Sequence, residues 1–343
     1  MNDRPTILVT GGAGYIGSHC SRALLAAGYH PVVFDNFSTG HRSFVTGSLV
    51  EGDLKDKAAL QQAFTQYDIA AVMHFAASSL VGESVIDPQK YYGNNVAGTL
   101  SLLEAMRAAG CNRLVFSSTG AVYGNADSKA LPEDYPCAPI NPYGASKWMI
   151  ERILADYRSA YGLGAFCLRY FNASGADASG SIGELRDNET HLIPRAMMAL
   201  QGHVPDFAVF GDDYDTPDGT AIRDYIHVTD LAAAHVAALQ LLMQGHRGGA
   251  FNLGTGTGFS VREILSAIAA ETGREVPQVV KPRRPGDPTY LVADPSAARE
   301  TLQFHPAHSD LATIIRTAWA WHQKAHPLRT SGPLSPVTKT TAA

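Results

Sequence analysis

The 343-residue sequence is poor in cysteine, in charged residues and in long apolar runs. Its four cysteines show no C-x-x-C spacing and are too few for a disulfide framework, which favours free thiols in a reducing compartment. No stretch stays apolar for long enough to span a bilayer, and the residues before Thr6 lack the basic and apolar parts of a signal peptide. These absences predict a cytoplasmic protein without a membrane partner.

Charge is sparse, because Asp, Glu, Lys and Arg make up only 17% of the chain. The net charge is −5 and no basic run occurs, which argues against nucleic acid as the main partner. No Cys/His cluster has the spacing of a zinc site. The acidic loop Asp212–Asp218 lacks the spacing and the final Glu of an EF-hand. The sequence therefore predicts a globular protein without a metal site.

Apolar strands and amphipathic helices alternate along the first half of the chain. Each expected helix is followed by a glycine, the usual residue just past a helix C-terminus. Strands that are apolar almost throughout are typical of a parallel sheet covered on both faces. The expected strands are Ile7–Thr10, Pro31–Asp35, Ala71–Phe75, Leu114–Ser118 and Phe166–Phe171, and the expected helices are Ser18–Ala27, Asn95–Ala109 and Tyr143–Tyr161. The pattern predicts an α/β fold built on a doubly wound parallel Rossmann sheet.

The composition changes after about Asn172, where Gly, Pro and Asp become frequent and helices are interrupted by loops. This change predicts a smaller α/β lobe that is interleaved with returns to the main sheet. We expect the main domain over residues 1–171, with later returns to its sheet at about 220–250. The lobe is expected mainly over 172–326, and a disordered tail over 327–343.

Gly11, Gly14 and Gly17 lie between the first expected strand and the first expected helix. In that position they allow a tight turn, close approach of a pyrophosphate and close helix packing, although a glycine-rich structural turn is the alternative. Asp35 ends the second strand about twenty residues further on, where a carboxylate binds ribose hydroxyls. The same carboxylate would repel a 2′-phosphate, and no Arg follows it directly. The motif therefore predicts NAD as the cofactor rather than NADP.

Two further segments are expected to contact such a cofactor. Asp53 is placed to meet the adenine, although a loop Asp that caps the next helix would look the same. The segment Phe75–Ser78 ends a strand, and its small residues Ala76 and Ala77 would let the backbone approach the cofactor. Those alanines could equally be ordinary core residues.

Tyr143 and Lys147 are four residues apart on an expected helix, so both lie on one face. An ammonium near a phenol favours the phenolate and lowers the Tyr pKa from about 10. The pair would then act as a general base. Because this spacing also occurs by chance on exposed helices, the functional interpretation depends on the glycine motif in the same domain.

Several motifs occur together in a characteristic order and spacing. They are Gly11–His19, His74–Ala77, Val81–Ser84, Asn94–Thr99, Ser117–Thr119, Tyr143–Lys147, Arg169–Asn172, Gly219–Val228 and Arg283–Asp287. These segments resemble the extended short-chain dehydrogenase/reductase superfamily, and within it the UDP-glucose 4-epimerase (UDP-galactose 4-epimerase) family. The resemblance extends from about Thr6 to Trp321 and so covers nearly the whole folded chain.

The resemblance implies that Thr119 supplies a hydroxyl beside the general base Tyr143 and its partner Lys147. It also implies that residues 1–171 bind NAD and that the lobe over 172–326 mainly binds a nucleotide sugar. Besides Gly11, Gly14, Gly17, Asp35, Asp53, Phe75, Ala76 and Ala77, the implied cofactor contacts are Tyr15, Ile16, Asn36, Leu54, Asn94, Lys147 and Tyr170. The implied substrate contacts are Thr119, Tyr143, Asn172, Leu192, Arg223, Arg284 and Asp287.

The chain departs from this family at three positions. Thr119 stands where many members carry a Ser, and it keeps the hydroxyl. Ser79 stands where some members have a Lys near the cofactor phosphates, and His191 replaces an Asn. Leu291, four residues past Asp287, takes a position that in similar enzymes carries either a bulky Tyr or a smaller residue facing the sugar 2-position. Leu leaves more room there for an N-acetyl group, although Leu291 could simply be a strand residue.

The implied reaction is the NAD-dependent interconversion of UDP-galactose and UDP-glucose, by transient oxidation at C4 and re-reduction from the opposite face. A 4-epimerase of UDP-N-acetylhexosamines or UDP-pentoses, and a non-catalytic NAD-binding scaffold, are the alternatives. A 4,6-dehydratase would need an acid and a base at the positions of Gly120 and Ala121. Neither residue can serve, which argues against that activity. The implied partner is a second copy of the chain, because in similar proteins the helices at about 95–109 and 143–161 form a two-fold contact.

Overall fold

The structure, a computed structural model, describes residues 4–284 and 286–326. Its main sheet has seven parallel strands in the order β12-β7-β5-β4-β1-β2-β3. The chain adds strands first on one side of β1 and then on the other, as in a doubly wound sheet. The strands are β1 (Thr6–Thr10), β2 (His30–Asp35), β3 (Ser48–Glu51), β4 (Ile69–His74), β5 (Arg113–Thr119), β7 (Gly164–Tyr170) and β12 (Gly248–Leu253). The predicted α/β class is confirmed.

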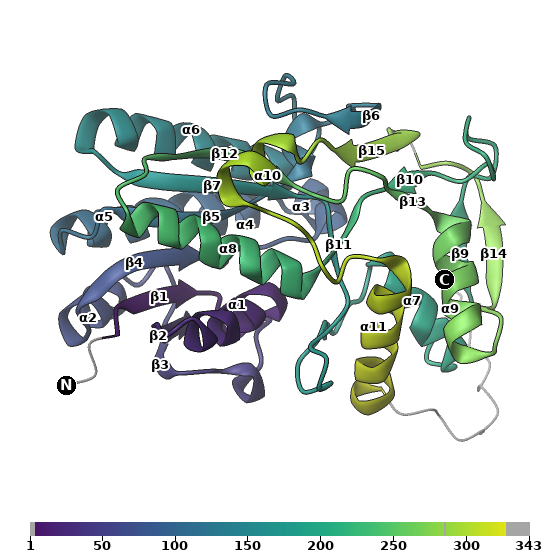
Figure 1. Cartoon of the computed structure of the whole chain (residues 1–343), viewed down its shortest axis with the longest axis horizontal. Helices are drawn as coiled ribbons and strands as arrows, with labels where there is room; N and C mark the ends of the chain where they lie inside the picture. The colour runs from purple at the N-terminus through teal and green to yellow at the C-terminus, as the bar shows by residue number, and fades with distance from the viewer. Residues whose placement is uncertain (1–3, 285, 327–343) are drawn as a thin grey trace, which may run out of the picture.

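Helices cover both faces of this sheet (Figure 1). On one face lie α1 (Tyr15–Ala26), α8 (Val228–Met243) and α10 (Ser296–Leu302); on the other lie α2 (Lys57–Gln66), α5 (Gly98–Ala108) and α6 (Pro142–Tyr161). Successive strand residues point to opposite faces, so Ile7 and Val9 are buried with the first group and Leu8 with the second. This burial on both sides explains why the strands are apolar almost throughout.

A smaller lobe lies beside the main sheet, on the right in Figure 1. Its core includes Ile193, Phe207, Ile264 and Ile315. The elements around that core are α7 (Leu192–Leu200), β9 (Phe207–Phe210), α9 (Val261–Thr272), β14 (Gln278–Lys281) and α11 (Leu311–Ala325). Two small sheets combine distant segments: β13 (Phe259–Ser260), β10 (Ile222–Arg223), β15 (Tyr290–Ala293) and β6 (Ser128–Leu131) form one, and β8 (Asn172–Ser174) and β11 (Tyr225–His227) the other.

The predicted helix ends agree with the structure. Gly110 follows α5 with a φ of 71°, and Gly162 caps α6 with the same φ. α6 begins at Pro142, because Asn141 accepts a hydrogen bond from the Gly144 N–H and proline suits the first helical position. The helix that carries the Tyr–Lys pair is therefore fixed at its N-terminus, only one residue before Tyr143.

One predicted helix is not a continuous α-helix. The segment expected over 95–109 begins within a π-helical turn, η2 (Tyr92–Ala97), and continues as α5. Such turns are often found at functional sites. The remaining short helices are η1 (Arg42–Phe44), α3 (Val81–Ile86), α4 (Pro88–Tyr91) and η3 (Gly120–Tyr123).

All four cysteines are free, as predicted. Among the helices of residues 4–284 and 286–326, none combines the length and the hydropathy needed to cross a membrane. The prediction for residues 327–343 lies outside the described residues. The division into domains at 171 and 172 stays a prediction.

Candidate active site

The loop between β1 and α1 is built against the end of β4. A Cβ atom added to Gly11, whose φ is 71°, would lie 2.5 Å from the Ala76 nitrogen, and one added to Gly17 would lie 2.2 Å from the Gly11 oxygen. Both positions therefore require glycine. Gly14 is the N-cap of α1 and provides no side-chain cap, so the first N–H groups of the helix face a space that suits an anionic group. This cradle fits the pyrophosphate of a dinucleotide.

Asp35 lies at the end of β2 beside this cradle and is 8% exposed. Its carboxylate accepts hydrogen bonds from the Ala13 N–H at 3.0 Å and from the Phe37 N–H at 2.8 Å. Burial raises the pKa of Asp35, and these two N–H groups oppose the rise. The carboxylate is thus fixed against the glycine loop, where the sequence predicted a ribose-binding group.

Asp53 does not cap the next helix, so that alternative interpretation is wrong. Asp56 is the N-cap of α2, and its carboxylate accepts from the N–H groups of the first turn. Asp53 instead accepts from the Asn36 amide at 2.8 Å and from the Lys55 N–H at 2.8 Å. Asp53, predicted to meet the adenine, and Asn36, an implied cofactor contact, are therefore hydrogen-bonded to each other, and the buried Leu54 follows Asp53.

Ala76 and Ala77 are half-buried, and Ala76 packs against the second core cluster. Phe75 packs against the first cluster, with its ring 4.9 Å from that of His235. Ala76 thus combines core packing with the close backbone approach to Gly11. The two interpretations of this segment are compatible.

Tyr143, Lys147 and Glu151 occupy one face of α6, at intervals of four residues. The Lys147 ammonium donates a 2.8 Å hydrogen bond to the Ser117 oxygen and lies 4.8 Å above the Phe116 ring centre. Burial lowers the pKa of Lys147 to about 7, and the charge of Glu151 opposes this shift.

The predicted fall of the Tyr143 pKa is not seen in this structure. Burial raises the pKa of Tyr143, whereas the Thr119 hydroxyl and the positive charge of Arg186 lower it. The desolvation of the phenol outweighs the charges around it, because a phenolate loses its hydration when it is buried. A further positive charge is needed before the phenolate forms near neutral pH.

The end of β5 delivers three consecutive hydroxyls. Ser117 shares a hydrogen bond with the Tyr170 hydroxyl, and Ser118 donates to Glu151 at 2.5 Å. The Thr119 hydroxyl accepts from the first turn of η3 and is the side-chain partner of Tyr143. The structure therefore places Thr119 beside Tyr143, and Lys147, one turn further along α6, at the Ser117 oxygen.

Asn95 and the Glu151–Arg169 pair were missed as site residues. Asn95 is fully buried; it accepts from the Ser78 N–H and donates to the Ser78 oxygen and the Ser146 hydroxyl. It thereby ties the end of β4 to α6, while the predicted Asn94 donates to it at 3.1 Å. A polar residue within the helix expected over 95–109 was the signal in the sequence that could have identified Asn95.

Three predicted substrate residues meet at the far side of the site. Arg223 pairs with Asp287 at 2.5 Å, and the Arg284 guanidinium lies 3.9 Å from the same carboxylate. Leu291 is the register partner of Arg223 on the neighbouring strand. Asn172 donates to the Asp224 oxygen at 2.9 Å in this structure. Leu192, half-buried, begins α7.

A buried ionic cluster lies in the loop that precedes α7 and was not predicted. The Glu184 carboxylate oxygen Oε1 lies 2.9 Å from the Arg186 Nε and 2.7 Å from the His191 Nδ1. Glu184, Glu189 and His191 also have the spacing of possible metal ligands. The charge of Glu184 is already met by Arg186 and His191, so we assign no metal here. The departure at His191 thus gives an ion pair within the lobe.

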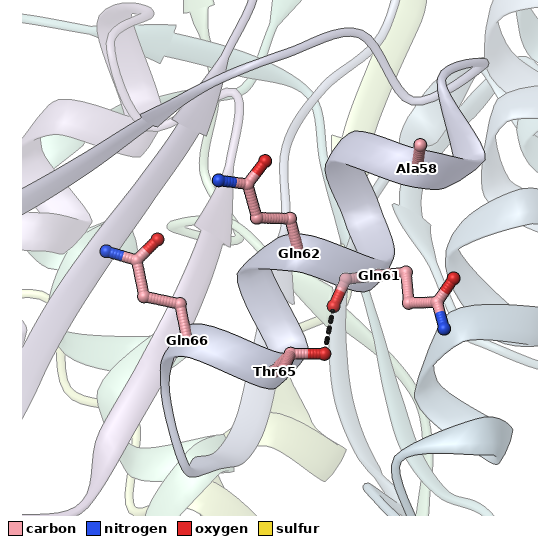
Figure 2. A pocket seen from close by; sticks show the side chains of 5 residues that line it. All are labelled: Ala58, Gln61, Gln62, Thr65 and Gln66. Atoms are coloured by element: carbon pink, nitrogen blue, oxygen red, sulfur yellow. Dashed lines mark hydrogen bonds between the residues drawn. The ribbon is translucent and has the colours of Figure 1, made fainter.

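A hollow on the surface of α2 contains none of the predicted site residues (Figure 2). It is lined by Ala58, Gln61, Gln62, Thr65 and Gln66. These side chains contain no ionisable group, and Thr65 donates to the Gln61 backbone. They offer no acid, base or nucleophile, so we assign the hollow no catalytic role.

The chain is similar to known proteins over almost its whole length. The model of the NAD dependent epimerase/dehydratase family matches residues 7–254. A protein of Rhizobium leguminosarum bv. trifolii named UDP-glucose 4-epimerase is 52% identical over 322 residues, which are 94% of this chain and 98% of that protein.

Two solved structures show the same fold. One is a UDP-glucose 4-epimerase from Brucella ovis in complex with NAD; it is 56% identical, with a TM-score of 0.90, and the match covers 92% of this chain and 97% of that one. The other, from Stenotrophomonas maltophila, has bound NAD and formylated UDP-arabinopyranose; it is 41% identical, with a TM-score of 0.91, and the match covers 94% and 98%.

Proposed function

This chain belongs to the NAD dependent epimerase/dehydratase family, and we propose that it catalyses the NAD-dependent interconversion of UDP-galactose and UDP-glucose. The observation that carries the proposal is the meeting of Tyr143, Lys147 and Thr119 beside the glycine cradle. The alternative of a non-catalytic scaffold is not favoured, because the base and its partners are all present. Relatives named for the same reaction also disfavour an enzyme specific for other UDP-sugars.

In the proposed reaction Tyr143 removes the proton from the sugar O4 and later returns it, while Thr119 orients that hydroxyl. Lys147 stabilises the phenolate, held in place by the Ser117 oxygen. NAD, when bound against the glycine loop and Asp35, would accept the hydride from the sugar C4 and return it. Lys147 and Thr119 are buried in the chain, at 3% and 7% exposed.

Inversion at C4 requires the oxidised sugar to present its opposite face, so strong binding must fall on the UDP part. We assign this anchoring to Arg223, Arg284 and Asp287, with Asn172 and Leu192 completing the nucleotide side. Guanidinium groups suit a diphosphate because each offers paired N–H donors. The assignment of residues 1–171 to NAD and of 172–326 mainly to the UDP-sugar is part of this proposal.

The direct test is to incubate the purified protein with UDP-galactose and to measure UDP-glucose without adding cofactor. We expect conversion to an equilibrium mixture, because NAD is regenerated in each turnover and copurifies with the protein. Absence of conversion by protein that contains stoichiometric NAD would contradict the proposal.

The position of Asp35 predicts cofactor selectivity. Wild-type protein is expected to prefer NAD, because the buried carboxylate repels a 2′-phosphate. Asp35→Ala should weaken NAD binding and reduce the preference over NADP by about tenfold or more. Dissociation constants for both nucleotides, measured on nucleotide-free protein, provide the check. Equal affinity of the wild type for NAD and NADP would show that Asp35 is not the selective group.

We further propose a cytoplasmic homodimer. Val85, Ile86, Leu100 and Met149 expose apolar side chains on α3, α5 and α6, and Ile86 is 86% exposed. α3 packs against α6, and exposed apolar side chains of this kind favour a contact between two copies of the chain. Light scattering at micromolar concentration should give twice the chain mass. Met149→Glu should shift the protein toward monomer, whereas a persistent wild-type monomer would reject the dimer.

Leu291 is proposed to face the sugar and to set the breadth of substrates. It packs beside Val122, Tyr123 and Phe171, next to the segment that follows Thr119. We expect measurable epimerisation of UDP-N-acetylglucosamine, and Leu291→Tyr should reduce only this activity, by about tenfold or more. Rates with both substrates, compared with the exposed-strand control Val279→Tyr, are the measurement. Equal damage to both activities would exclude Leu291 as the gate.

A further inference from the structure

Arg186 belongs to the substrate lobe by sequence but reaches the cofactor half of the site. It lies in the loop between β8 and α7. One terminal nitrogen of its guanidinium approaches the Ser79 hydroxyl at 3.4 Å. Ser79 directly follows the β4 segment that packs against Gly11. The contact therefore places a cation from the lobe next to the loop that cradles the pyrophosphate.

The charge of Arg186 acts on three tyrosines of the site. Burial raises the pKa values of Tyr15, Tyr143 and Tyr170, and the positive charge of Arg186 opposes the rise at each of them. Tyr15 is the first residue of α1, whereas Tyr143 is on α6 and Tyr170 ends β7. Arg186 is thus near enough to the first residue of α1 and to the proposed base to act electrostatically on both.

The Arg186 guanidinium is held by Glu184 through one of its nitrogens, which leaves other N–H donors for a ligand. Its Nε donates to the buried Glu184 at 2.9 Å, and Glu184 is held in turn by His191. The side chain is 26% exposed. A guanidinium has five N–H donors, and the contacts to Glu184 and Ser79 use Nε and one terminal nitrogen. The other terminal nitrogen is left to bind an anionic oxygen.

We propose that Arg186 binds a phosphate oxygen of the NAD pyrophosphate, so that the substrate lobe helps to retain the cofactor. This assignment rests on the proposed function and deepens it. The pyrophosphate is favoured over the substrate diphosphate because Ser79 and Tyr15 belong to the cofactor loops. Arg223 and Arg284, paired with Asp287, already serve the substrate side. Arg186 is a binding residue on these grounds, and Glu184 positions it.

The test compares ligands that share or lack the pyrophosphate, on protein freed of nucleotide. Arg186→Gln should weaken NAD and ADP-ribose to the same extent, by about 10- to 100-fold, because one charge-assisted hydrogen bond is lost. Adenosine, which has no phosphate, should bind as to wild type. Isothermal titration calorimetry provides the dissociation constants. Arg186→Lys should recover part of the loss, since it restores the charge but not the planar fork.

Two control variants separate binding from structure. Arg316→Gln removes the same charge from an exposed position on α11 and should leave all three affinities unchanged. Glu184→Gln keeps Arg186 but loosens its support, so it should weaken NAD less than Arg186→Gln does. Unchanged NAD affinity in Arg186→Gln, a loss confined to NAD but not ADP-ribose, or an equal loss for adenosine would each overturn the proposal. Wild-type protein that binds no NAD would refute the proposed function itself.

Discussion

Replacing Tyr143 by phenylalanine is expected to lower kcat by about two to four orders of magnitude, because the variant keeps the ring but loses the group that accepts the proton. The ring of Tyr143 packs edge-on to that of Tyr91, with centroids 6.5 Å apart, and phenylalanine preserves this contact. The fold and the bound NAD should therefore be retained. Steady-state rates with UDP-galactose and the NAD content of the purified variant are the two measurements.

Tyr157→Phe is the matched control, since Tyr157 lies on the same helix and packs against Tyr161 away from the site. It should leave kcat within about twofold of wild type, as expected for a residue that touches neither reactant. Near-normal turnover in Tyr143→Phe would exclude Tyr143 as the base. Loss of NAD from the same variant would mean that the Tyr143 hydroxyl is needed to retain the cofactor.

The pKa values in the site explain why neither Tyr143 nor Lys147 is sufficient alone. Burial raises the pKa of Tyr143 and lowers that of Lys147 to about 7, so it opposes the charged form of both groups. The attraction between the two charges is visible in the sequence spacing, whereas the loss of hydration follows from burial in the fold. The positive charge of Arg186 favours the Tyr143 phenolate, whereas the negative charge of Glu151 favours the Lys147 ammonium.

Local patterns were sufficient to predict the main sheet, the glycine cradle and the Tyr–Lys face. Alternating burial of Ile7, Leu8 and Val9 produces a continuous apolar run that is visible without a structure. The spacing of Gly11, Gly14 and Gly17 is likewise a local pattern, although the atom that excludes a side chain at Gly11 belongs to the distant Ala76. These features depend on residues that are close in sequence or follow a fixed period.

Contacts between distant segments were not predictable. Arg186 and Ser79 are far apart in the chain, and nothing in the composition of either segment pairs them. Arg169 was visible only as part of a family motif, whereas its partner Glu151 looked like an ordinary helix residue. Long-range pairing of charges depends on the topology, which sets the neighbours only after the sheet has formed.

The buried Glu151–Arg169 ion pair lies next to the predicted site residues and supports them. Both side chains are about 5% exposed or less, and the closest atoms are 2.6 Å apart. Glu151 also accepts from Ser118, next to the proposed catalytic residue Thr119, and its charge opposes the fall of the Lys147 pKa. The pair therefore connects the stability of the core to the position of the catalytic helix.

Arg169→Met should lower the free energy of unfolding by about 3–5 kcal/mol, because it leaves the Glu151 carboxylate buried without its cation. Arg169→Met combined with Glu151→Leu should recover more than half of that loss, since two apolar side chains replace the pair. Arg316→Met, on an exposed position of α11, is the control and should change stability by no more than about 0.5 kcal/mol. Urea unfolding of the NAD-loaded protein measures all four proteins at one cofactor concentration. If Arg169→Met costs less than about 1 kcal/mol, or if the double variant is less stable than the single one, the pair does not carry the charge balance that its burial requires.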